Sequence, residues 1–176
     1  RQFSDLEHMS RAMIAAWNSR VTNDDTVYHL GDFAMGLRTE IPGILGQLAG
    51  DIILIPGNHD MPRDFHYFPK VLRPPVVLEH EGKLIELIHN PRKMHGLGDL
   101  TFCGHVHNAW SFIPKGDTIP GSVSRSRKNN GEPACVSLAD VYNVGVDVCG
   151  YVPRTFDEIV NAPVRAMWKP DTSADC

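Results

Sequence analysis

The short apolar run Ile52-Ile53-Leu54-Ile55 most constrains the fold, because it is rich in β-branched residues and is closed by Pro56. Such a run is typical of a buried strand. The tetrapeptide Gly57-Asn58-His59-Asp60 follows at once, with an amide, an imidazole and a carboxylate in a row. Open α/β sheets bind ligands at the ends of their buried parallel strands. Taken alone, the tetrapeptide fits a ligand-binding loop and a simple polar turn comparably well.

The residues before this run predict a strand, a helix and a second strand in succession. Thr26 to Leu30 has the character of a strand, and Gly31-Asp32 follows it directly. The segment from Thr39 to Gly50 predicts a helix, because its apolar residues share one side and Pro42 suits a first turn. A crossover of this kind between parallel strands is expected to be right-handed.

Two capping boxes predict helices near the ends of the chain. Ser4 with Glu7 opens a helix that extends to about Arg20, and Thr155 with Glu158 opens a short one near the C-terminal end. Between them, the pattern predicts a hairpin followed by two further strands: Val76 to Glu79, Lys83 to Ile88, Asp99 to Cys103 and Tyr142 to Val148.

Composition describes an ordinary globular chain. Its 176 residues are enough for one domain with a substantial core, and its net charge of −4 gives no global basic field for nucleic acid or membranes. The four cysteines lie far apart with no CxxC pair, which favours free thiols in a reducing compartment. No apolar run approaches the roughly 20 residues that span a bilayer. We expect a cytoplasmic protein with one domain over residues 1–176.

Polar residues suited to binding a metal come just after the predicted strands. Because strand ends at one edge of a sheet converge, these residues are expected to lie together despite their separation in sequence. They offer imidazoles, a carboxylate and an amide oxygen, which suit Mn²⁺, Fe, Zn²⁺, Ni²⁺ or Co²⁺ better than Ca²⁺. The set is Asp32, Asn58, His89, His105 and His107. Beside them, Asp60 could hold the tautomer of His59 or raise its basicity.

The order of these motifs resembles the calcineurin-like metallophosphoesterase superfamily. The motifs are Gly31-Asp32, Gly57-Asn58-His59-Asp60, His89 and Gly104-His105-Val106-His107. The stretches from Asp25 to Phe33 and from Asn143 to Asp147 are closer still to its small phage- and bacterial-type branch. The resemblance covers nearly the whole chain, apart from residues 111–138, which look like an insertion loop.

The resemblance implies an α/β fold, an αββα sandwich of two mixed sheets with helices outside. It also implies two divalent metals, most often manganese, about 3.5–4 Å apart around a phosphate. By motif, Asp32 would bridge both metals, while Asn58, His89 and His105 would complete one and His107 would belong to the other. Asn58 would also touch the phosphate.

The implied reaction is hydrolysis of a phosphomonoester or phosphodiester by a hydroxide that bridges the metals. His59 would protonate the leaving oxygen or stabilise the charged transition state, with Asp60 orienting it. The substrate would be a small phosphoester or a nucleotide. Arg125 and Arg127, with Lys128, could contact further phosphates, which leaves a nuclease open as an alternative. A non-catalytic interaction scaffold on a degraded site is the other alternative.

One departure from the family pattern concerns the second metal. The family opens with a strand carrying Asp-x-His, whose residues bind the metal served by His107, and no Asp-x-His precedes Asp32 here. We expect that strand to lie upstream of Arg1. The other possibilities are that the protein has lost it or that another chain supplies it.

Overall fold

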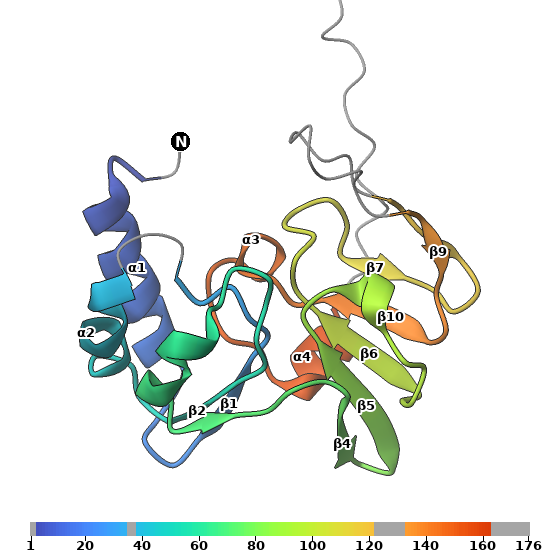
Figure 1. Ribbon diagram of the computed structural model, residues 1–176, viewed down its shortest axis with the longest axis horizontal. Helices are drawn as coiled ribbons and strands as arrows, with labels where there is room; N and C mark the ends of the chain where they lie inside the picture. The colour runs from blue at the N-terminus through green and yellow to red at the C-terminus, as the bar shows by residue number, and fades with distance from the viewer. Residues whose placement is uncertain (1–2, 35–37, 122–132, 163–176) are drawn as a thin grey trace, which may run out of the picture.

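Two β-sheets dominate the computed structural model, which describes residues 3–34, 38–121 and 133–162 (Figure 1). The first sheet has three strands in the order β1-β2-β3, and the second has five in the order β4-β5-β6-β10-β7. The first contains β1 (Thr26–His29), β2 (Asp51–Leu54) and β3 (Lys70–Val71). The second contains β4 (Val76–His80), β5 (Lys83–Ile88), β6 (Leu100–Cys103), β7 (Phe112–Ile113) and β10 (Asp140–Asn143). A separate antiparallel pair is formed by β8 (Thr118–Ile119) and β9 (Cys135–Val136).

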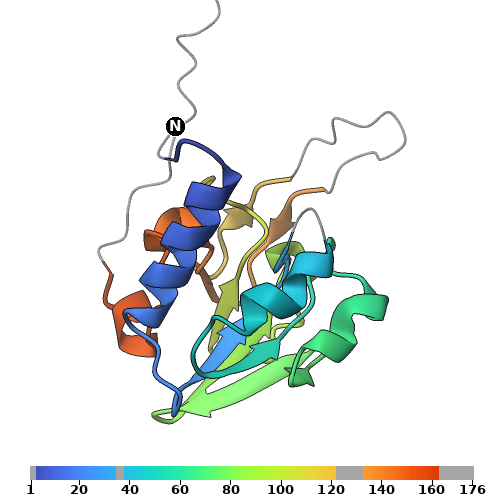
Figure 2. The ribbon, with the colours of Figure 1, turned by 90° about the vertical axis from the view of Figure 1, so that its left-hand side faces the viewer.

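The first sheet confirms the predicted strand–helix–strand unit. β1 pairs in parallel with β2, and the chain between them forms a 3₁₀ turn, η1 (Arg38–Glu40), and helix α2 (Ile41–Leu45). α2 is shorter than the predicted helix, because it ends at Gly46 and only isolated turns follow. α2 and the N-terminal helix α1 (Leu6–Asn18) lie over this sheet (Figure 2).

The second sheet contains the predicted hairpin, β4 with β5 in antiparallel register. β5, β6 and β10 run parallel to one another, and β7 pairs antiparallel with β10. This sheet is mixed as expected, whereas the three strands of the first sheet are all parallel. The α/β sandwich is confirmed, and the type of the first sheet is corrected.

Three apolar clusters separate the layers. One lies between the sheets and joins Leu30 and Ile55 of the first sheet's strand ends to Leu87 and Phe102 of the second. Another packs α1 and α2 against the outer face of the first sheet through Trp17 and Leu45. The third lies on the other face of the second sheet. Loops and the strand pair β8–β9 cover that face, in place of the helix that the predicted sandwich implies (Figure 1).

The predicted N-terminal capping box, with Ser4 as the N-cap, is wrong in detail. Asp5, rather than Ser4, is the N-cap of α1, and its carboxylate accepts a hydrogen bond from His8 N at 2.7 Å. Aspartate caps helices as well as serine does, so the helix begins one residue later than predicted. The second capping box is confirmed, since Thr155 and Glu158 bond reciprocally at the start of α4 (Phe156–Val160).

The predicted strand from Tyr142 to Val148 is also wrong beyond its first residues. β10 ends at Asn143, whose Oδ1 accepts a hydrogen bond from Gly145 N at 2.9 Å, and a short helix α3 (Val146–Cys149) follows. The alternating valines gave this segment the pattern of a strand. The local hydrogen bond of the asparagine side chain turns the backbone instead.

The remaining connections are short. η2 (Pro62–Tyr67) and η3 (Pro91–Lys93) are 3₁₀ turns after β2 and β5. Within residues 111–138, β7, β8 and β9 give parts of the predicted loop regular structure. No helix among the described residues is long and apolar enough to cross a membrane. Cys103, Cys135 and Cys149 are free thiols, and Cys176 lies outside the described residues.

Candidate metal centre

Four predicted ligands meet where strands of the two sheets end. Asp32 follows β1, Asn58 follows β2, His89 follows β5 and His105 follows β6. His89 Nε2 lies 3.0 Å from Asn58 Oδ1, 3.1 Å from His105 Nδ1 and 3.3 Å from Asp32 Oδ2. The ligand atoms of Asp32, His89 and His105 all lie within 4.8 Å of one another. We call these four residues the buried ligand group after His89, which is buried at its centre, although Asp32 and His105 are half-buried and Asn58 is exposed.

The spacing of these atoms fits a single cation. Ligands about 2.1 Å from one ion are roughly 3.0–3.4 Å from each other in octahedral or tetrahedral geometry. The contacts around His89 Nε2, at 3.0–3.3 Å, fall in that range. The set of two imidazoles, one carboxylate and one amide oxygen suits a divalent transition metal.

The tautomer of His89 supports the same conclusion. Its Nδ1 lies 2.7 Å from the carbonyl oxygen of Leu30, which can only accept a hydrogen bond. A neutral His89 ring therefore carries its proton on Nδ1 and presents a lone pair at Nε2. That lone pair points at the oxygens of Asn58 and Asp32, which are also acceptors. A cation between them would satisfy all three.

Asp32 is held in its charged form. Burial works to raise its pKa, but the hydrogen bond from the backbone N–H of His59 and the neighbouring histidines hold the pKa below its usual range. The His59 N–H donates to Asp32 Oδ1 at 2.9 Å, which leaves Oδ2 on the side of His89. The carboxylate is thus ionised and oriented throughout the neutral pH range.

Two glycines let the strand ends approach this closely. A Cβ on Gly57 would lie 2.2 Å from Asp32 Oδ1 and 2.7 Å from His89 Cε1. A Cβ on Gly31, which has a φ of +86°, would lie 2.2 Å from Gly57 N. Any side chain at either position would displace a ligand or the loop that supports it.

Asp60 holds these loops together through their backbone amides, whereas the sequence predicted that it would orient the His59 ring. Its Oδ2 accepts hydrogen bonds from Asp32 N at 2.7 Å and Gly57 N at 2.8 Å, and its Oδ1 accepts from Phe33 N at 3.0 Å. Both carboxylate oxygens are therefore committed to backbone amides, and none of the hydrogen bonds among the described residues joins Asp60 to the His59 ring. The residue ties the loop after β1 to the loop after β2.

Three predicted ligands have left-handed backbones. Asp32, His105 and His107 have φ values of 54°, 69° and 49°. Aspartate and histidine tolerate this region better than most residues, but each still costs about 1–2 kcal/mol. Strain of this kind gathers at functional sites, where the surrounding structure fixes the backbone to aim a side chain.

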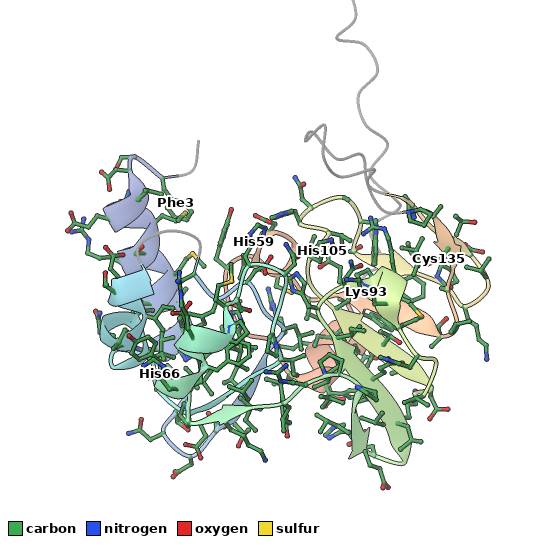
Figure 3. The ribbon with its side chains drawn as sticks, viewed as in Figure 1. Phe3, His59, His66, Lys93, His105 and Cys135 are labelled. Atoms are coloured by element: carbon green, nitrogen blue, oxygen red, sulfur yellow. The ribbon has the colours of Figure 1, made fainter. Side chains whose placement is uncertain are left out.

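His59 lies at the rim of the site. Its side chain is exposed, and its ring makes no hydrogen bond to the part of the chain that the structure describes. His59 and His105 come from the loops after β2 and β6 and lie on the same side of the molecule (Figure 3). The ring is free to meet a molecule bound beside Asp32.

His107 stands apart from the buried ligand group. Its ring is 76% exposed, and its Nδ1 lies 3.2 Å from Asp147 Oδ2 in the first turn of α3. Asn143 Nδ2 donates to the His107 carbonyl at 2.6 Å and to the Trp110 carbonyl at 2.7 Å, which fixes the His107 loop to β10. Sequence reasoning gave no role to Asp147, although its stretch from Asn143 was part of the family resemblance.

Three other residues are not among these ligands. His29, left without a role by the sequence, has a buried Nδ1 with no hydrogen-bond partner in the described residues, and burial lowers its pKa to about 4. It is therefore a neutral ring in the strand that leads to Asp32. Arg125 and Arg127, predicted to contact phosphate, lie outside the described residues.

The two-sheet fold and the ligands at its strand ends define a metallophosphoesterase-like protein. The chain belongs to the calcineurin-like phosphoesterase superfamily, whose domain model matches residues 2–143 and confirms the resemblance drawn from the motifs. Proteins of this superfamily are mostly phosphoester hydrolases, and they typically bind divalent metals.

The chain is also similar to one relative in sequence and to one solved structure in fold. The chain is 31% identical over 162 residues to an uncharacterized protein of Methanocaldococcus jannaschii, and the match covers 91% of this chain and 78% of the relative. The fold is similar to the crystal structure of a protein of unknown function from Aquifex aeolicus, with a TM-score of 0.62 and 23% identity. That match covers 89% of this chain and 86% of the other, and it supports the fold alone.

Proposed function

We propose that this protein hydrolyses phosphoesters with divalent metal ions bound by Asp32, Asn58, His89 and His105. The observation that carries the proposal is the convergence of three ligand atoms, from Asp32, Asn58 and His105, at 3.0–3.3 Å from a fourth, His89 Nε2. When bound, divalent metals lower the pKa of a coordinated water and neutralise charge on phosphoryl oxygens. His107 would serve a second metal position beside the buried ligand group.

The residues of the chain have separable tasks in this proposal. Asp32 is ionised and held by the His59 N–H, so it offers a fixed negative oxygen. His89 presents Nε2 because Leu30 holds its Nδ1, and Asp60 keeps the two loops at their spacing. The exposed ring of His59 is in a position to donate a proton to the leaving oxygen of a bound phosphoester.

The substrate class is a small phosphoester or a nucleotide. A non-catalytic scaffold needs neither this mixed set of metal ligands nor an exposed histidine at the rim of the site. The nuclease alternative depended on Arg125 and Arg127, which lie outside the described residues. Hydrolysis of simple phosphoesters is therefore the function that the geometry supports best.

The test is hydrolysis of bis-p-nitrophenyl phosphate and p-nitrophenyl phosphate, which are diester and monoester probes. Protein stripped by a chelator should be inactive and should recover with Mn²⁺. Asp32→Ala should lower activity by at least about 100-fold and lose bound metal. Asp24→Ala removes an exposed aspartate elsewhere on the chain and should behave like the parent. Activity of Asp32→Ala at the parent rate would reject the proposal.

A further inference from the structure

We propose that Asp147 is a positioning residue for His107: it holds the ring proton on Nδ1 and so turns Nε2 toward a bound metal. This inference rests on the proposed function, in which His107 serves the second metal position. It gives a role to the stretch from Asn143 to Asp147, which the buried ligand group does not use.

The contact itself sets the tautomer. His107 Nδ1 lies 3.2 Å from Asp147 Oδ2, and an ionised carboxylate can only accept a hydrogen bond. A neutral His107 must then carry its proton on Nδ1. His89 shows the same arrangement, since its Nδ1 lies 2.7 Å from the Leu30 carbonyl. In both residues the partner at Nδ1 leaves Nε2 as the ligand atom, as is usual for histidines that bind metals.

Hydrogen bonds connect the backbone around Asp147 to the loop that carries His107. Asn143 is 5% exposed, and its Nδ2 donates to the carbonyls of His107 and Trp110. Its Oδ1 accepts from Gly145 N, and the Gly145 carbonyl in turn accepts from Val148 and Cys149. One buried side chain thus joins the strained loop of His107 to the first turn of α3, where Asp147 lies. α3 is at the same end of the molecule as His59 and His105 (Figures 1 and 3).

The contact between His107 and Asp147 adds little to the stability of the fold. The side chains of His107 and Asp147 are 76% and 34% exposed, and pairs at such positions contribute little to stability. The contact matters for the direction of the ring, because an exposed histidine with no partner at Nδ1 would rotate and exchange tautomers. A fixed ring direction and a fixed tautomer lower the free-energy cost of ordering His107 when a metal binds.

The test is the tautomer of His107 in metal-free protein, read from two-bond ¹H–¹⁵N couplings in protein labelled at histidine. The pH is set above the ordinary histidine pKa so that the ring is neutral, and His107→Ala identifies the resonance. The parent should show the Nδ1–H form, and Asp147→Asn, which keeps an oxygen acceptor, should retain it. Asp147→Ala should lose this preference. Asp157→Ala is the control, because it removes an exposed aspartate from the first turn of α4.

A second readout is metal affinity. Asp147→Ala should weaken the weaker of two Mn²⁺ binding steps by about 10-fold, as loss of such outer partners does at other sites. An unchanged His107 tautomer in Asp147→Ala would overturn the inference, whatever the metal affinity. Absence of phosphoester hydrolysis in the parent would reject the proposed function alone, because the tautomer is measured without metal or substrate.

Discussion

In the proposed function, the buried ligand group and the His107–Asp147 pair form two halves of one site, and these halves are built in different ways. Around His89, whose side chain is 6% exposed, contacts come from both sheets, two glycines admit the close approach, and Asp60 braces the loops. His107 is 76% exposed and has one contact from its ring to the described residues, to Asp147. The first half is fixed by the fold itself, whereas the second depends on one short helix.

This difference shows what fixes a ligand residue in position before a metal binds. Ligands at the ends of buried parallel strands inherit their positions from the sheet, so little order remains to be gained when a metal binds. An exposed ligand on a left-handed loop needs partners of its own. We therefore expect one tight and one weaker metal-binding step, and the predictions that follow test each half separately.

The largest effect is expected at His59, which separates chemistry from metal binding. His59→Ala should lower turnover of bis-p-nitrophenyl phosphate by about 10²–10⁴-fold, the usual contribution of a general acid. Metal content measured by elemental analysis should stay at the parent value, because the backbone N–H that contacts Asp32 remains. His66→Ala, which removes another exposed histidine, serves as control. Parent turnover in His59→Ala would remove the residue from the mechanism.

A pair of glycine substitutions compares the two halves directly. Gly57→Ala places a methyl group 2.2 Å from Asp32 Oδ1, so it should lower both tight Mn²⁺ affinity and activity by about 100-fold. In the other half, Gly145→Ala would meet Asn143 Oδ1 at 3.0 Å, a contact that a small shift relieves, and should change both quantities far less. Equal effects of the two substitutions would show that the halves are equally preformed.

A smaller effect is expected from His29, which lies beneath the buried ligand group. Burial lowers its pKa to about 4, against about 6.5 in an unfolded chain. Between these values the unfolded chain binds more protons. Stability of the metal-free protein should therefore fall by up to about 3 kcal/mol as pH drops from about 6.5 to about 4.

The measurement is urea unfolding across that pH range, with His29→Leu as the comparison. The nearby charges of Asp60 and Asp32 oppose the effect of burial, and the charge of His89 adds to it. Removing the imidazole should flatten the pH dependence. The same slope in His29→Leu and in the parent would assign the acid sensitivity to other groups.

The sequence predicted the parts of the fold that depend on periodicity. The runs before Gly31, Gly57, His89 and Gly104 form the strands β1, β2, β5 and β6, and the ends of these strands bring four predicted ligands together. The motif order was sufficient to predict the family, which the match over residues 2–143 confirmed.

Local hydrogen bonds of side chains were harder to anticipate. The valines after Asn143 alternate as in a strand, but the asparagine turns the chain into α3 and brings Asp147 to His107. Asp60 is next to His59 in sequence, yet its carboxylate binds amides of two loops. The first outcome depends on a hydrogen bond between residues two apart in sequence, and the second depends on contacts between the loops after β1 and β2; periodicity encodes neither.

The central claim is that Asp32 and its neighbours hold a metal tightly, while His107 serves a weaker position. Calorimetric titration of Mn²⁺ into metal-free parent, Asp32→Ala and His107→Ala tests it most directly. The account predicts two binding steps in the parent, loss of the weaker step alone in His107→Ala, and loss of both in Asp32→Ala, because Asp32 is proposed to bridge the two positions. Tight Mn²⁺ binding that survives in Asp32→Ala would contradict it.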